Sequence, residues 1–430
     1  MKYLSILLTL FLFSSNNISA QTITEAELND IEPKVIEWRR HLHQNPELSN
    51  REFETGKYIN ARLQEMGIET ETGVAHTGVV GFIKGGKPGP TVALRADIDA
   101  LPVTEEVDIP FASKVKTTYL DKEVGVMHAC GHDSHVAMLL GAAKLLKDKQ
   151  KELKGNVVLI FQPAEEGAPI GEEGGAKLIV KEGILEKYKV DVIFGQHIGA
   201  ATKTGTIDYR FGGIMAAADQ FSIKIKGQQA HGSRPWSGVD PVTISAQVIM
   251  GLQTIVSRQM DLTKEAVVIS VGKIEGGVRN NIIPNEVNLI GTIRTLDVDM
   301  QKIVHEKIRK TVTLIAEAGG AEAEVDIRIG YPVTHNNREL TQKMLPTLFR
   351  SAGEENVRVV PARTGAEDFS FYAMEVPGLF YFLGGRPADI EESNASRHHT
   401  PMFYLEESGF ILGVKTMTNL ALDYMNLEEK

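Results

Sequence analysis

The chain has 430 residues, of which 42% are hydrophobic and 24% charged, and its formal net charge is −10. This length exceeds what a single hydrophobic core usually serves, so we expect a globular protein of two domains. The negative charge and the lack of a basic stripe in the sequence exclude nucleic-acid binding, which depends on clustered lysine and arginine side chains.

The first twenty residues predict a secretory signal peptide. They carry one lysine and an apolar run over 3–13, and they end on the small residues Ser19 and Ala20. The run is too short to serve as a membrane anchor. We therefore expect an exported protein, periplasmic or secreted, without a membrane span. The only cysteine, Cys130, cannot form an internal disulfide, which favours another use such as metal binding.

Helices and strands alternate through the first half of the mature chain. Apolar residues at helical spacing predict helices over 27–45 and 51–67. Apolar runs bounded by glycine and proline then predict strands with helices between them. The strands are expected over 77–86, 89–102, 155–167 and 191–199, and the helices over 134–150 and 174–185. This alternation predicts an α/β domain whose mostly parallel sheet is covered on both faces.

A different order of elements begins near residue 216. The pattern over 219–330 is strand, helix, two strands, helix and strand. This βαββαβ order is typical of a small α+β sandwich with a ferredoxin-like fold. We therefore divide the chain into a signal peptide, the first part of the α/β domain, an inserted domain and the second part of the α/β domain, over 1–20, 21–215, 216–330 and 331–430.

Acidic and histidine residues gather where three predicted strands of the α/β domain end. Asp97 and Asp99 follow one strand, Glu165 and Glu166 the next, and His197 the third. The carboxyl ends of parallel strands meet at one edge of a sheet, where the chemistry of such folds collects. Neighbouring glutamates in an extended segment point to opposite sides, so one can hold a metal while the other faces a water molecule. The pattern indicates metal-assisted hydrolysis.

Further candidate ligands lie in two other segments. Residues 127–135, MHACGHDSH, place three histidines and Cys130 next to a predicted helix. Thiolate and imidazole bind zinc-like cations well, although a buried structural cysteine is the alternative. Near the C-terminus, His398 and His399 are either ligands or part of a solvated loop. The sequence has no G-x-S-x-G motif, which excludes a serine hydrolase of the α/β type.

A set of motifs gives the chain a close resemblance to the M20 metallopeptidases. The closest branch is that of N-acyl-amino-acid amidohydrolases, hippurate hydrolases and auxin-conjugate hydrolases. The similarity spans essentially the whole mature chain, and HACGHD together with PAEEG is its most specific part. In order, the motifs are RRHLHQNPELS, RADIDALP, MHACGHDSH, QPAEEG, GQHIG, GQQAHGSRP, GGVRNNIIPNEV, TGAEDFSFY and SRHHTPMF.

The resemblance implies a site of two divalent metal ions, whether zinc, manganese, cobalt or nickel, with attack by a hydroxide held between them. Glu165 matches the general base and acid, and Asp99 matches an aspartate that orients a ligand. The five implied metal ligands are Cys130, His132, Glu166, His197 and His399.

Two assignments within this site are less definite. Asp97 stands where other branches have a histidine ligand, so its role here stays open. His399 is preferred to His398 because it begins the pattern H-[ST]-P.

The inserted domain resembles the lid and dimerisation domain of the family, which predicts a homodimer. His231 matches a histidine that polarises the scissile carbonyl, supplied in dimeric relatives by the partner subunit. Asn281, Arg294 and Gly365 are expected at the substrate. Arg294 would grip the α-carboxylate of an amino acid through two parallel hydrogen bonds, with Asn281 beside it. A strand charge paired with a neighbouring acid is the alternative for Arg294.

The resulting hypothesis is metal-dependent hydrolysis of N-acyl amino acids. A dipeptidase or carboxypeptidase acting on short peptides is the alternative within the family, and a non-catalytic metal- or ligand-binding protein is the rival from another class. Glu165 argues against the rival, because a carboxylate beside the metals serves proton transfer. One departure concerns residues 197–205, HIGAATKTG, which lack a proline that relatives often have there. We expect a reshaped pocket rim, which leaves the substrate preference open.

Overall fold

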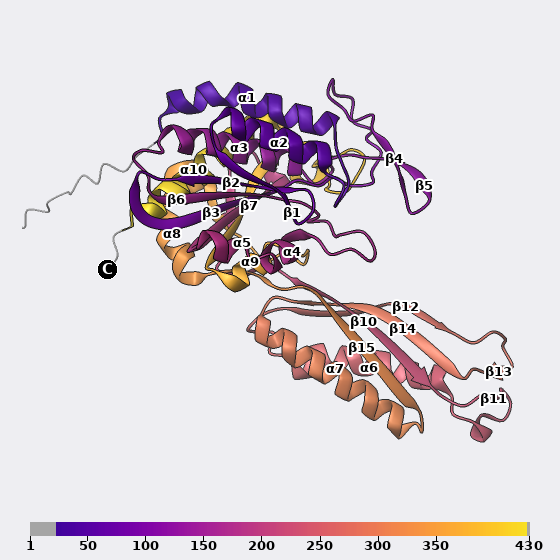
Figure 1. Ribbon diagram of the computed structural model, residues 1–430. Coiled ribbons are helices and arrows are strands. Elements are labelled where there is room, and N and C mark those ends of the chain that lie inside the picture. The colour runs from indigo at the N-terminus through magenta and orange to yellow at the C-terminus, as the bar shows by residue number, and fades with distance from the viewer. Residues whose placement is uncertain (1–22, 428–430) are drawn as a thin grey trace, which may run out of the picture.

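The computed structural model describes residues 23–427 (Figure 1). The expected signal peptide over 1–20 lies outside the described residues. Within 23–427, no helix combines the length and the apolar character needed to cross a membrane.

An eight-stranded sheet forms the centre of the larger of two domains, here called the large-sheet domain. Its strands are β1 (Glu69–Val74), β2 (Gly78–Lys84), β3 (Lys87–Asp97), β6 (Lys154–Gln162), β7 (Val192–Lys203), β8 (Ile207–Tyr209), β17 (Val357–Val359) and β18 (Gly378–Arg386). Their order is β1-β2-β6-β3-β7-β18-β8-β17. The central strands β6, β3, β7 and β18 are parallel, which confirms the mostly parallel sheet that the sequence predicted.

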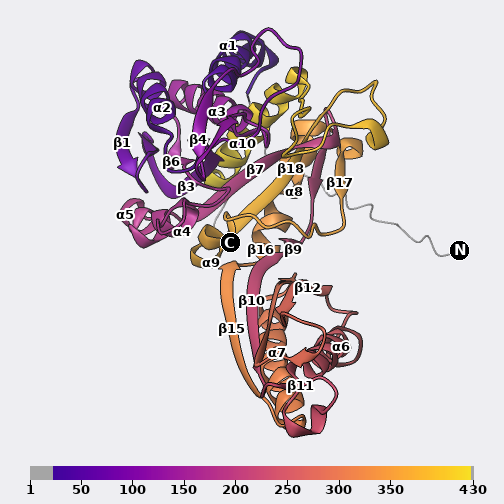
Figure 2. The ribbon, with the colours of Figure 1, turned by 90° about the vertical axis from the view of Figure 1, so that its right-hand side faces the viewer.

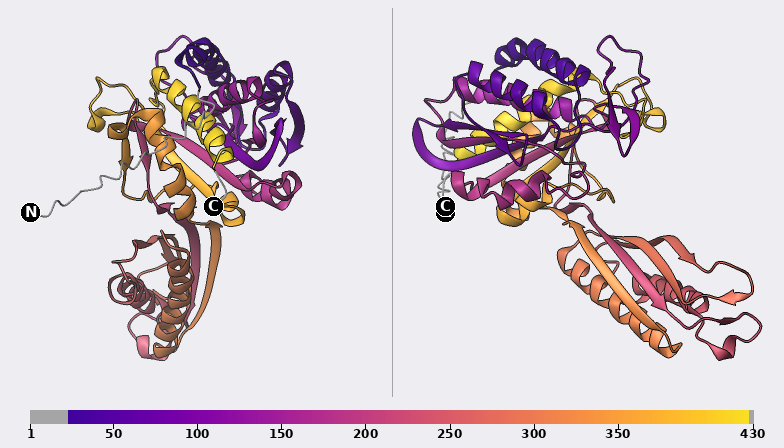
Figure 3. Two further views of the ribbon diagram at one scale, coloured as in Figure 1. Left: turned by 90° about the vertical axis from the view of Figure 1, so that its left-hand side faces the viewer. Right: turned by 45° about the vertical axis from the view of Figure 1, so that its right-hand side comes forward.

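Helices cover both faces of this sheet (Figures 1 and 3). One face packs against α1 (Glu25–Gln44), α2 (Phe53–Glu65), α3 (His132–Asp148), α8 (Arg338–Ala352) and α10 (Phe410–Met425). The other packs against α4 (Gly175–Lys181), α5 (Ile184–Tyr188) and α9 (Ser370–Glu375). The sequence predicted one helix over 174–185, and this is wrong. Gly183 adopts a φ of 75° and separates α4 from α5.

A second sheet over 217–331 forms the small-sheet domain. Its elements are β10 (Ala217–Lys226), α6 (Pro241–Gln259), β12 (Val267–Gly276), β14 (Glu286–Thr295), α7 (Val298–Ala318) and β15 (Glu322–Tyr331). The antiparallel order β12-β14-β10-β15 is the ferredoxin-like arrangement expected of the βαββαβ pattern. Both helices pack on one face of the sheet, and the side chains of Asp240 and Asp297 cap their N-termini.

The small-sheet domain projects away from the large-sheet domain, and β10 and β15 join the two (Figure 2). A two-stranded ribbon of β11 (Ala230–His231) and β13 (Ile282–Ile283) lies at its far end (Figure 1). The remaining short strands are β4 (Lys116–Tyr119), β5 (Lys122–Gly125), β9 (Gly212–Met215) and β16 (Thr334–Asn336).

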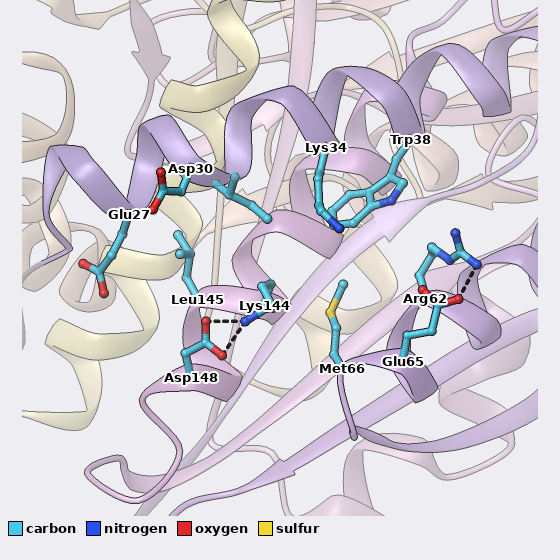
Figure 4. A pocket seen from close by; sticks show the side chains of 11 residues that line it. Glu27, Asp30, Lys34, Trp38, Arg62, Glu65, Met66, Lys144, Leu145 and Asp148 are labelled. Atoms are coloured by element: carbon cyan, nitrogen blue, oxygen red, sulfur yellow. Dashed lines mark hydrogen bonds and ion pairs between the residues drawn. The ribbon is translucent and has the colours of Figure 1, made fainter.

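A groove of about 360 Å³ lies between α1, α2 and α3 (Figure 4). Trp38, Met66 and Leu145 contribute its apolar lining, and the ion pair between Lys144 and Asp148 lies at its side. The expected metal ligands do not line this groove. It is therefore separate from the candidate active site.

Candidate active site

The five expected metal ligands converge beside the carboxyl ends of the central strands. Cys130 and His132 lie at the start of α3, Glu166 follows β6, His197 lies within β7, and His399 lies in the loop before α10. The Sγ atom of Cys130 is 3.3 Å from Nε2 of His197 and 3.3 Å from Nε2 of His399. The same His399 nitrogen is 3.0 Å from Oε1 of Glu166. Residues from four separate segments thus offer one cluster of donor atoms.

Unusual backbone conformations place two of these segments. Gly131, between Cys130 and His132, has a φ of 96°, and a Cβ there would lie 2.7 Å from Cγ2 of Ile198. His399 has a φ of 62°, which few residues other than glycine adopt. Its backbone N–H donates to the carbonyl oxygen of Ala129 at 2.8 Å. Strained conformations of this kind concentrate at functional sites.

Hydrogen bonds orient two of the histidines with Nε2 toward the cluster. Nδ1 of His132 is 2.9 Å from the carbonyl oxygen of Asp99, and Nδ1 of His197 is 2.7 Å from that of Ile198. A carbonyl oxygen only accepts, so Nδ1 carries a proton and Nε2 is the nitrogen left to bind a cation. Nε2 of His132 is buried and has no hydrogen-bond partner among residues 23–427. A buried nitrogen in this state fits a divalent cation.

Asp99 connects the histidine and glutamate parts of the cluster. Its carboxylate accepts hydrogen bonds from the backbone N–H groups of Glu165 and Glu166, each at 3.1 Å, and from Oγ of Ser49 at 2.8 Å. Oδ1 also lies 3.3 Å from Nδ1 of His132. These are the contacts that an orienting aspartate makes.

The charge of the cluster favours a cation. Burial lowers the pKa of His132, but the carboxylates of Asp97, Asp99 and Glu166 outweigh it and raise this pKa to about 10. Burial and the charges of Glu166 and Glu165 raise the pKa of the Cys130 thiol well above its usual range. The negative potential that raises the pKa of His132, and that adds to the effect of burial at Cys130, attracts divalent metal ions.

His398 lies at the edge of the same cluster. Its Nδ1 is 3.6 Å from Sγ of Cys130, and its Nε2 accepts a hydrogen bond from the backbone N–H of Ala200 at 3.1 Å. Burial lowers the pKa of His398 to about 3, so the ring is neutral. Because Nε2 accepts a hydrogen bond, Nδ1 carries the proton and points it at the sulfur. This arrangement leaves His399 better suited than His398 to bind a metal.

Asp97, whose role the sequence left open, is held by two residues that the sequence analysis missed. Its Oδ1 lies 2.5 Å from Nδ1 of His135, and its Oδ2 accepts a hydrogen bond from Arg95 at 2.7 Å. Nε2 of His135 in turn accepts the N–H of Ile198 at 2.8 Å. The spacing of His132 and His135 could have indicated this, because residues three apart share a helix face. Asp97 and His135 brace the strand that carries His197.

Glu165 is 7% exposed and lies among other carboxylates. Oxygens of Glu165, Glu367 and Asp368 lie within 4.8 Å of one another. Arg95 contacts both partners, Glu367 at 3.0 Å and Asp368 at 2.8 Å. Burial and the charges of Glu367, Glu166 and Asp368 raise the pKa of Glu165 well above its ordinary range, against the effect of Arg95. Of this segment only Gly365 was predicted from the sequence as a site residue, and Glu367 and Asp368 were not.

His231 and Asn281 lie in the small-sheet domain, where the two-stranded ribbon places them away from the cluster (Figure 1). His231 is exposed, and its Nδ1 accepts the backbone N–H of Ser233 at 3.1 Å. The proton of the neutral ring therefore lies on Nε2, which can donate. The carbonyl oxygen of Asn281 accepts the N–H of Gly232 at 2.9 Å, so Asn281 adjoins His231.

Arg294 and Gly365 form their hydrogen bonds with residues other than the candidate metal ligands. Arg294 lies on β14 and donates to Oγ1 of Thr292 and to the carbonyl oxygen of Ile293. Within 23–427 Arg294 forms no ion pair with an acidic residue. The alternative, in which Arg294 is a strand charge paired with a neighbouring acid, is therefore wrong. Gly365 is exposed at the junction of the domains, where its carbonyl oxygen accepts the N–H of Ala216 at 2.9 Å.

Comparison with known proteins adds independent information. The sequence pattern of the family described as Peptidase family M20/M25/M40 matches residues 93–423. The chain is 41% identical over 402 residues to a Saccharolobus solfataricus protein named Thermostable carboxypeptidase 2, covering 93% of this chain and 98% of the relative. It is 40% identical over 387 residues to the N-acetyl-L-cysteine deacetylase of Bacillus subtilis, covering 89% of this chain and 86% of the relative.

A solved structure is also similar over most of the chain. It is that of a Bacillus subtilis protein described as a dinuclear metal binding peptidase from the M20 family. The identity is 34%, the TM-score is 0.78, and the match covers 93% of this chain and 99% of the other.

Proposed function

The chain belongs to peptidase family M20/M25/M40, and on this basis we propose that it hydrolyses the amide bond between an acyl group and an amino acid. Family membership makes it a metal-dependent hydrolase of linear amides. The observation that carries hydrolysis, rather than binding alone, is Glu165, buried beside the donor atoms of His132 and Glu166. Proton transfer needs such a carboxylate, whereas holding ions does not, which argues against a non-catalytic binding protein.

The donor set suits two divalent ions, with zinc, manganese, cobalt and nickel as candidates. When bound, the ions polarise the scissile carbonyl and activate a water molecule. Glu165 takes the proton of that water on a carboxylate oxygen and delivers it to the nitrogen of the departing amino acid. Asp99 keeps Glu165 in place through the Glu165 backbone N–H. The residues that would hold the ions are Cys130, His132, Glu166, His197 and His399.

The small-sheet domain supplies the remaining groups. His231 donates its Nε2 proton to the substrate carbonyl oxygen as that oxygen gains negative charge. It reaches the substrate by closure of this domain or from the second subunit of a homodimer. Arg294, which has no acidic partner among residues 23–427, binds the α-carboxylate together with Asn281, while Gly365 presents backbone at the domain junction. These roles need a small-sheet domain, of the same chain or of the second subunit, to approach the large-sheet domain.

A carboxypeptidase is the second candidate. The relative named Thermostable carboxypeptidase 2, at 41% identity, favours it. A carboxypeptidase and an N-acyl-amino-acid hydrolase cleave the same kind of bond, next to a residue with a free α-carboxylate. They differ only in whether the other half is a peptide or a simple acyl group.

Hydrolysis of a substrate panel tests the proposal. N-acetyl and N-benzoyl amino acids, their α-amides and short peptides are incubated with the purified protein, before and after treatment with a chelator. We expect hydrolysis of the N-acyl amino acids, its loss with the chelator and its return with added metal. Faster cleavage of the peptides would favour the carboxypeptidase. Binding of the substrates without hydrolysis, whichever metal is added, would favour the non-catalytic binding protein.

A further inference from the structure

A second cavity, of about 570 Å³, lies on the large-sheet domain. It borders the group of candidate metal ligands, which is here called the metal cluster. His398, whose Nδ1 is 3.6 Å from Sγ of Cys130, lines it. So do Ala201 and Lys203 at the end of β7. Both belong to the segment 197–205, where this chain departs from the pattern of the family. The departure therefore falls on the wall of a cavity next to the candidate active site.

The lining of this cavity has an excess of positive charge. Its basic residues are Lys203, Arg358, Arg363 and Arg386, and its acidic residues are Asp208 and Glu392. Asp208 is paired with Arg358 at 2.8 Å. Arg386 donates to the carbonyl oxygens of Ala201 and Ile390, and within 23–427 neither Arg386 nor Lys203 forms an ion pair. The cavity therefore offers basic side chains whose charge the protein itself does not balance.

Arg363 is the basic residue of this lining that stacks on an aromatic ring. Its guanidinium carbon lies 3.5 Å from the centroid of the Phe382 ring. Phe382 is the register partner of the candidate ligand His197, and the two ring centroids are 6.1 Å apart. The nearest carboxylate oxygen of Asp208 is 4.0 Å from Arg363, whose side chain is 37% exposed. Stacking thus orients the guanidinium near the metal cluster and leaves its N–H groups available for an anion.

We propose that this cavity binds a carboxylate at the far end of the acyl group, with Arg363 as its receptor. The planar guanidinium matches a carboxylate through two parallel hydrogen bonds, and Lys203 and Arg386 strengthen the attraction. The inference rests on the proposed function, in which Arg294 of the small-sheet domain binds the α-carboxylate. A receptor on the large-sheet domain then serves the other half of the substrate. The preferred substrates are amino acids acylated with a dicarboxylic acid.

A pair of substrates that differ only in charge tests this inference. The values of kcat/KM are measured for an N-glutaryl amino acid, for the analogue whose terminal carboxylate is an amide, and for the N-acetyl derivative. We expect the wild type to favour the glutaryl compound over its amide by roughly 10- to 100-fold, as a charged hydrogen-bonded pair provides. Arg363→Met should abolish this preference and still hydrolyse the N-acetyl derivative.

Arg338→Met is the matched control. Arg338 also stacks on an aromatic ring, with its guanidinium carbon 5.4 Å from the centroid of Phe211, but it does not line the cavity. This variant should keep the full preference for the glutaryl compound. Because the preference is a ratio within one protein, partial unfolding of a variant does not obscure it.

Either of two results with the glutaryl compound would overturn the inference while the proposed function stands. One is equal kcat/KM for the glutaryl compound and its amide in the wild type, and the other is an unchanged preference in Arg363→Met. A variant that instead loses discrimination between an α-carboxylate and an α-amide would assign Arg363 to the amino-acid half and also overturn it. Hydrolysis of none of the three compounds would overturn the proposed function itself.

Discussion

At Glu165 the protein places a carboxylate under opposing electrostatic effects. Burial and three neighbouring carboxylates raise its pKa, while Arg95 lowers it. Metal ions bound at the adjacent donor atoms act in the same direction as Arg95, because positive charge favours the ionised form. A carboxylate held between these effects can accept a proton and return it within one catalytic cycle.

Glu165→Gln should therefore keep the metals and lose turnover. The substitution removes the proton acceptor but none of the five candidate ligands, so we expect kcat to fall by roughly 10²- to 10⁴-fold. Metal content, measured by elemental analysis of the purified variant, should match the wild type. Near-normal turnover would contradict the assignment of Glu165 as the base.

Cys130→Ser should instead weaken metal binding. Burial and nearby carboxylates raise the pKa of the Cys130 thiol, so a metal must displace its proton to bind the sulfur. A serine hydroxyl keeps its proton more firmly still. After dialysis against a weak chelator, we expect the variant to retain less metal than the wild type and to lose activity in parallel. If both stay normal, Cys130 is structural.

Among the elements, β15 links the small-sheet domain to the candidate base. The hydroxyl of Tyr331, the last residue of β15, donates to the carbonyl oxygen of Glu165 at 2.6 Å. On the neighbouring strand β10, buried Asp219 accepts hydrogen bonds from Gln301 of α7 at 2.8 Å and from the N–H of Gly330 at 3.2 Å. The strands that join the domains are thus fixed both to α7 and to the active site.

Tyr331→Phe should lower kcat by about 3- to 10-fold, the effect of one lost hydrogen bond on the position of Glu165. Tyr188→Phe is the control, because it removes a tyrosine hydrogen bond to Glu71, 2.9 Å long, rather than one to the candidate base. Steady-state kinetics give the kcat values of both variants, which are compared with that of the wild type. Equal effects of the two substitutions would show that the Tyr331 contact serves stability alone.

For the whole molecule, the separation of His231 from the metal cluster raises the question of how a complete site forms. Mixing the variants His231→Ala and Glu165→Gln addresses it, since each should be inactive alone. If His231 acts across a dimer, the mixed dimers contain one intact site and activity returns, up to about a quarter of the wild-type level. No recovery despite proven subunit exchange would favour closure within one chain.

The stability of the whole fold should also depend on pH through Glu52. This buried carboxyl accepts hydrogen bonds from Thr77 at 2.6 Å and from the N–H of Ala164 at 2.9 Å. Burial and the charge of Asp99 raise its pKa from 4.5 to about 8. The unfolded chain therefore loses this proton first as pH rises, so Glu52 destabilises the fold increasingly between about pH 4.5 and pH 8.

Glu52→Gln, which cannot ionise, should flatten this dependence. Urea denaturation at pH 5 and pH 8 measures it: the wild type should lose more stability than the variant over this interval. Parallel loss in both proteins would show that other groups cause the dependence.

The sequence by itself determined most elements before residue 331 and, through short motifs, the candidate donor atoms. Apolar periodicity is a local property, so it located β3, β6, α3 and the βαββαβ order, and short motifs carried Cys130, His132 and Glu166 with them. The carboxylates around Glu165 were decided only by tertiary structure, because Arg95 meets Asp368 across 273 positions of the chain. The cationic cavity beside His398 and the separation of His231 from the candidate metal ligands were also decided by tertiary structure. Both depend on how distant segments and whole domains pack, and no local pattern of residue types encodes that geometry.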